Sequence, residues 1–92
     1  MASIAFKVVD GKVVLVPRGG NPGEPLKVAR GATVTWNNLT KEIHHPVAIN
    51  PPGFITDQIA PDDVSDPGFV ATKTITYECS LHPDEKGSIE VA

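Results

Sequence analysis

The sequence is poor in sulfur-containing residues. Among 92 residues there is one cysteine, Cys79, and the single methionine is Met1. A lone cysteine excludes an intramolecular disulfide, so Cys79 is a buried apolar residue, a reactive thiol or a metal ligand. Taken alone it is more typical of a core than of a site, because free cysteine is among the most buried residue types.

Long apolar runs and blocks of one charge are also missing. No stretch approaches the roughly 20 apolar residues that a membrane-spanning helix needs, so no spanning segment is expected. Eight basic and 11 acidic residues give a formal net charge of −3, and neither sign forms a block. A nucleic-acid partner, which needs a basic stripe facing the phosphates, is therefore not expected.

Length and composition favour one small β domain. A chain of 92 residues has room for a single domain, residues 1–92, with one core. The apolar share is 40%, and eight glycines and nine prolines are spread along the chain, which favours short strands joined by turns. Met1 leads straight into folded-looking sequence, so we expect either a cytosolic protein or an exported one whose secretion signal has been removed.

Apolar and polar residues alternate with a period of two in several segments, as they do in strands with one buried face. Asp10 and Gly11 suit a tight hairpin turn, and residues 54–68 read as a long connection with a short helical turn near 60–64. Strands are expected at residues 4–9, 12–16, 26–29, 33–37, 46–49, 69–71, 74–78 and 88–91. The pattern predicts an all-β sandwich of about seven or eight strands.

Soft and borderline metal ligands gather at two places in the sequence. His44 and His45 come just before an expected strand, and Cys79 and His82 come just after another. Thiolate and imidazole together suit copper or zinc, and Cu²⁺ heads the affinity order for nitrogen and sulfur sites. Cys79 and His82 can converge within the compact loop 79–87, and a histidine from the first place would complete a transition-metal site.

Two motifs give the sequence its resemblance to a known family. One is RGATVTWNN at residues 30–38 followed by HPV at 45–47, and the other is YECSLHP at 77–83 followed by GSIEV at 87–91. Over residues 26–92 the chain resembles the cupredoxins, and within them the amicyanin and plastocyanin group. The resemblance implies a Greek-key β-sandwich that holds one copper ion per chain, cycling between Cu(I) and Cu(II).

The resemblance also implies a set of copper ligands. In that family the first histidine ligand lies two places before a valine, which selects His45 ahead of Val47 and leaves His44 as a solvated or outer neighbour. Cys79 and His82 supply the other two strong ligands. Glu85 stands where the axial methionine would fall, so the expected metal site is His45, Cys79, His82 and Glu85, with a solvated loop acid as the alternative for Glu85.

A glutamate at this position changes the expected chemistry. A carboxylate is a harder, anionic ligand than a thioether, so Glu85 would favour Cu²⁺ over Cu⁺ and lower the reduction potential. The ligand set is then similar to that of the red copper protein nitrosocyanin, although its glutamate comes from another loop. The resemblance further implies that Asn38 ties the first-histidine loop to the cysteine loop and that Trp36 packs in the core.

The function implied by the resemblance is single-electron transfer, with a redox partner protein that receives or donates the electron at the solvent edge of His82. We expect a periplasmic or otherwise exported protein, either a monomer or a small homo-oligomer. Whether it is an enzyme stays open, with electron transfer favoured because the sequence shows no general base or nucleophile beyond the ligands.

Two other functions stay open at this point. One is an open red-type copper site that binds or converts nitric oxide, peroxide or superoxide. The other is a copper carrier or a structural zinc module, because the same four residues make an acceptable tetrahedral zinc set.

Overall fold

The computed structural model describes residues 2–50, 52–65 and 68–92, and within them it contains nine strands and no helix. The strands are β1 Ala2–Val9, β2 Lys12–Pro17, β3 Leu26–Val28, β4 Ala32–Asn38, β5 Pro46–Asn50, β6 Pro52–Phe54, β7 Phe69–Ala71, β8 Ile75–Cys79 and β9 His82–Val91. The all-β prediction is confirmed, with β6 as a strand that the sequence pattern does not predict. In the part of the chain that is described, no helix is long and apolar enough to cross a membrane.

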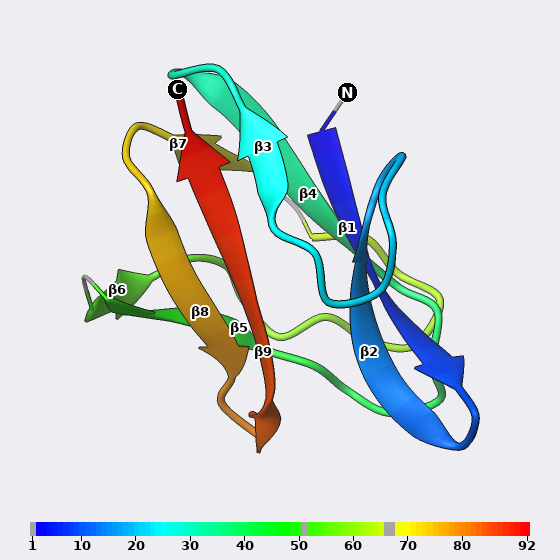
Figure 1. The fold of residues 1–92 in the computed structure, drawn as a ribbon. Helices are drawn as coiled ribbons and strands as arrows, with labels where there is room; N and C mark the ends of the chain where they lie inside the picture. The colour runs from blue at the N-terminus through cyan, green and yellow to red at the C-terminus, as the bar shows by residue number, and fades with distance from the viewer. Residues whose placement is uncertain (1, 51, 66–67) are drawn as a thin grey trace.

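The strands form two sheets packed face to face (Figure 1). One sheet has the order β2-β1-β4-β7 and the other the order β3-β9-β8-β5-β6. The chain passes repeatedly between the sheets, so β1 pairs with β4 in parallel and β3 pairs with β9 in parallel. Two segments distant in sequence, the start of β5 and the end of β8, thereby become neighbours in one sheet.

The core lies between the sheets because each strand turns alternate residues inward. In β4 and β8 the buried residues fall two apart, as the period of a strand requires. Trp36 is fully buried and meets Tyr77 edge-on, with ring centroids 5.3 Å apart, so the prediction that Trp36 packs in the core is confirmed. Gly87 leaves room for this arrangement, since a Cβ there would lie 2.5 Å from the Tyr77 hydroxyl oxygen.

Two segments differ from the sequence prediction. Residues 60–64 contain no helical turn; Val64 instead forms an isolated bridge with Asn37. The loop expected at 79–87 is mostly strand, because β9 begins at His82 and only Ser80 and Leu81 turn between β8 and β9. This early start of β9 determines how the ligand residues are presented.

Candidate metal centre

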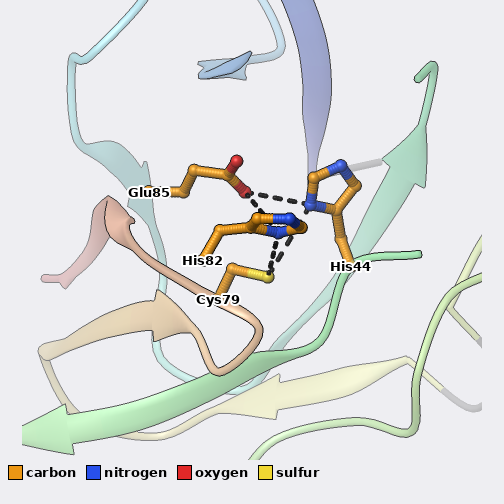
Figure 2. A group of neighbouring side chains, drawn as sticks. All are labelled: His44, Cys79, His82 and Glu85. Carbon is orange, nitrogen blue, oxygen red and sulfur yellow. Dashed lines mark hydrogen bonds and ion pairs between the residues drawn. The ribbon is translucent and has the colours of Figure 1, made fainter. Parts of the chain in front are cut away.

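Four side chains converge at the end of the sandwich where β8 stops and β9 starts (Figure 2). They are His44, Cys79, His82 and Glu85, and one potential ligand atom from each lies within 4.8 Å of the other three. His44 Nδ1 and His82 Nδ1 are each 3.6 Å from Cys79 Sγ. Glu85 Oε1 is 2.9 Å from His44 Nδ1 and 3.8 Å from His82 Nδ1.

The β8–β9 hairpin supplies three of the four residues. Cys79 pairs with His82 across the hairpin, and Glu78 pairs with Lys86, with the register shift between these two pairs. Residues 83–85 therefore have no partner on β8 and bulge from the sheet. Gly87 pairs with Tyr77 across the hairpin, and strand alternation places Glu85 on the same face of β9 as Gly87. His82 pairs with Cys79 and lies on that face too, because the bulge lies between His82 and Lys86. The bulge brings both side chains to the thiol.

The fourth residue is His44, where the sequence analysis expects His45. Pro46 is buried and pairs with Cys79, and His44, two residues earlier, lies on the same inner face of the chain. His45 points to the opposite face, where its Nδ1 lies 3.0 Å from the Ser80 hydroxyl oxygen. The structure therefore brings together Cys79, His82 and Glu85 as expected but places His44, not His45, beside them.

The phase of this segment is hard to infer from its residues. Both faces of β5 are apolar, with Val47 and Ile49 on one side and Pro46 and Ala48 on the other. The larger pair suggests the wrong inner face, since Ile49 is exposed in the structure. The pairing of Pro46 with Cys79 fixes the phase, and that contact joins residues 33 apart in sequence.

His45 still takes part through its backbone. Its N–H donates to Cys79 Sγ over 3.3 Å, and its carbonyl accepts a 2.8 Å hydrogen bond from the Ser80 N–H. The backbone of residue 45 thus ties the histidine segment to the cysteine segment.

Three sets of contacts hold His44 in place, two to its ring and one to its backbone. Phe6 of β1 stacks on it with ring centroids 4.3 Å apart and planes 8° apart. The His44 backbone exchanges two hydrogen bonds with Ile59. Its Nε2 lies 2.8 Å from the Thr40 hydroxyl oxygen, which leaves Nδ1 as the nitrogen facing the cluster.

Asn38 organises the loop that leads to His44. Its Nδ2 donates to the carbonyls of Glu42 and Ile59, and its Oδ1 accepts from the backbone and hydroxyl of Thr40. The expected link from Asn38 to the cysteine loop is therefore replaced by bonds within its own loop and to Ile59. The backbone of His45 makes the connection to Cys79 instead.

Burial lowers the pKa of His44 below its ordinary value of 6.5, and the Glu85 carboxylate offsets only part of that effect. The side chain has no exposed surface. Near neutral pH the ring is therefore uncharged, which is the form that binds a metal.

This shift predicts how the stability of the metal-free protein depends on pH. Between 6.5 and the lower folded-state pKa, the unfolded chain binds a proton at His44 that the folded chain does not. The free energy of unfolding is thus expected to fall as pH drops below about 6.5. Urea unfolding from pH 7.5 to 5 would measure the slope, and His44→Gln should flatten it; equal slopes in both proteins would contradict the prediction.

The donor set and its spacing fit a transition metal. Nitrogen and sulfur ligands at about 2.0 and 2.3 Å from one ion, separated by tetrahedral to trigonal angles, lie about 3.5 to 3.7 Å apart. Both histidine nitrogens are 3.6 Å from Cys79 Sγ. One thiolate, two imidazoles and one carboxylate suit copper or zinc better than magnesium or calcium, which prefer oxygen ligands.

No protein-family model matches the chain, and no curated protein matches its sequence. Solved structures do match it. A purple cupredoxin from Nitrosopumilus maritimus superposes with a TM-score of 0.72 at 22% identity, and each chain covers 100% of the other. A Cu(I) structure of an amicyanin mutant gives a TM-score of 0.67 at 21% identity, covering 98% of this chain and 80% of the other. A reduced amicyanin mutant gives 0.68 at 19% identity, covering 98% and 82%. The chain therefore has the cupredoxin fold.

Proposed function

We propose that the protein binds one copper ion through His44, Cys79 and His82, with Glu85 as a fourth ligand, and transfers single electrons. The observation that carries this proposal is the convergence of four ligand atoms within 4.8 Å. It occurs in a fold shared with an amicyanin whose structure is a Cu(I) form. A copper ion bound there would supply a one-electron couple.

The residues around the cluster suit electron transfer because they allow little movement. His44 and Cys79 are buried, and Phe6, Thr40 and the backbone of His45 hold them. A fixed ligand set limits the rearrangement that accompanies a change of oxidation state. His82 is 35% exposed and is the one histidine of the cluster that reaches the surface, so it is the natural route for the electron.

The proposal also covers the cellular location, the oligomeric state and the redox partner of the protein. We infer that the protein works outside the cytoplasm, as a monomer or small homo-oligomer, and exchanges electrons with a redox protein that docks over His82. A carboxylate ligand would hold the potential low, so that partner is comparatively reducing. A structural zinc module remains the competing function, since the donor set suits zinc as well.

Copper titration tests the proposal. One equivalent of Cu²⁺ should produce an intense sulfur-to-copper charge-transfer band, and Cys79→Ser should abolish it. The copper-loaded protein should then undergo repeated reduction and reoxidation by one electron in voltammetry. Binding of zinc in preference to copper, or a band that survives in the serine variant, would refute the copper–thiolate site. A spectrum strongly altered by azide would indicate an open site that binds small molecules.

A further inference from the structure

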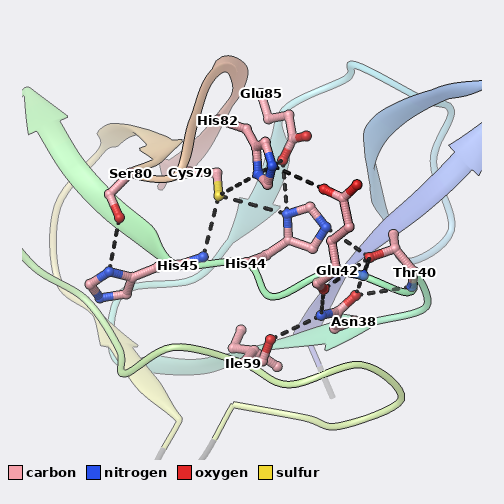
Figure 3. Close-up of polar contacts among 10 residues, drawn as sticks. All are labelled: Asn38, Thr40, Glu42, His44, His45, Ile59, Cys79, Ser80, His82 and Glu85. Atoms are coloured by element: carbon pink, nitrogen blue, oxygen red, sulfur yellow. Dashed lines mark hydrogen bonds and ion pairs between the residues drawn. The ribbon is translucent and has the colours of Figure 1, made fainter.

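His82 is held from outside the cluster by an acid on the histidine loop. Its Nδ1 faces Cys79 and Glu85, while its Nε2 lies 3.0 Å from Glu42 Oε2 (Figure 3). This distance lies within the range of an N–H···O hydrogen bond. Neither the family motifs nor the ligand pattern in the sequence points to Glu42.

The position of Glu42 is built into the loop. Its N–H donates to the Thr40 hydroxyl oxygen over 3.2 Å, and its carbonyl accepts a 2.7 Å hydrogen bond from Asn38 Nδ2. The same Thr40 hydroxyl contacts His44 Nε2. In both histidines of the cluster, Nε2 faces away from Cys79, and residues 38–44 supply its contact. Thr40 contacts Nε2 of His44, and Glu42 contacts Nε2 of His82.

Resting on the proposed copper function, we propose that Glu42 is a positioning residue of the metal centre. An ionised carboxylate only accepts hydrogen bonds, so the proton of a neutral His82 ring lies on Nε2 and a lone pair is left on Nδ1. The carboxylate also makes the imidazole a stronger donor to a metal. Glu42 thereby selects the tautomer that binds copper and favours Cu²⁺ over Cu⁺.

The solvent exposure of Glu42 and His82 makes it possible to test a positioning role separately from a contribution to folding stability. Glu42 is 66% exposed and His82 35%, and ion pairs at that exposure add little to folding stability. A change at Glu42 should therefore leave the urea midpoint nearly unchanged. An effect on the ring nitrogens or on copper would then report positioning.

The experiment compares Glu42→Ala and Glu42→Gln with Glu90→Gln, which removes the same charge from an exposed site on β9. Long-range ¹H–¹⁵N spectra of the metal-free protein at pH 8 give the tautomer of His82. We expect Nε2–H in the wild type and the control, a mixture in Glu42→Ala, and partial rescue in Glu42→Gln, whose amide oxygen still accepts. Cu²⁺ affinity should fall on the order of 10-fold in Glu42→Ala, and the potential should rise.

The metal-free spectra keep this inference separate from the copper proposal. A protein that prefers zinc to copper would refute the proposed function, and the tautomer of His82 would still decide the role of Glu42. An unchanged tautomer in Glu42→Ala, together with a metal affinity no different from that of Glu90→Gln, would show that the contact is only a surface ion pair.

Discussion

Replacing His44 with alanine is expected to abolish the copper spectrum, whereas replacing His45 with alanine should leave it almost unchanged. His44 Nδ1 lies 3.6 Å from Cys79 Sγ and 2.9 Å from Glu85 Oε1, so its loss removes a nitrogen from the cluster. The His45 side chain contacts Ser80 on the other face, and its alanine variant keeps the N–H that donates to Cys79. The two adjacent residues thus serve as matched variants.

The loss of copper affinity in His44→Ala should exceed the loss caused by removing a residue that only hydrogen-bonds to a ligand. Losing an outer hydrogen-bond partner of a ligand typically costs 10–100-fold in metal affinity, and a lost ligand should cost more. Copper titration with visible and electron paramagnetic resonance spectra would measure both variants. His44→Gln adds a variant that fills more of the space against Phe6, and circular dichroism of the metal-free proteins would check folding. A collapse in His45→Ala with a normal spectrum in His44→Ala would assign the ligand to residue 45.

The alternating segments were sufficient to predict the architecture. Thr33 to Asn37 and Thr74 to Glu78 alternate with a period of two, and they correspond to β4 and β8, the strands that bury Trp36 and Tyr77. Local pattern succeeds there because one face of each strand is buried against the other sheet. The same pattern cannot show which strands are neighbours, since pairs such as β1 with β4 depend on contacts between distant residues.

The grouping of Cys79 and His82 could be predicted because both belong to one hairpin, whereas Glu85 was expected only from the family resemblance. The bounds of β9 were harder to predict. The bulge at residues 83–85 forms because β9 pairs with β8 both before it, at His82, and after it, from Lys86 onward. The resemblance selected His45 through its distance from Val47, whereas the structure places the His44 side chain in the cluster. A shift of one residue along a strand reverses the face of every side chain, so the local pattern alone does not separate the two. The Glu42 contact with His82 could not be predicted from the sequence either. It joins residues 40 apart and depends on how the loop that carries Glu42 folds against β9.

Glu85→Met is expected to raise the reduction potential by on the order of 100 mV, which for one electron is roughly 2.3 kcal/mol. The Glu85 side chain is 11% exposed, and its Oε1 lies within 4 Å of both histidine nitrogens of the cluster. That placement argues against a solvated loop acid. As a ligand, its negative charge would stabilise Cu²⁺ more than Cu⁺ and weaken the copper–thiolate overlap, so the wild-type colour should lie away from intense blue.

Methionine at position 85 restores a soft donor at the same point of the bulge, and the spectrum should shift toward blue as the potential rises. Glu85→Gln keeps the size and removes the charge, so its potential should rise by less. Asp84→Asn is the matched control, because it removes a charge from the exposed neighbouring residue in the same bulge. Protein-film voltammetry and visible spectra of the four proteins would decide the question. A blue wild type with the same potential in Glu85→Met, Glu85→Gln and Asp84→Asn would remove Glu85 from the ligand set and leave a three-ligand site.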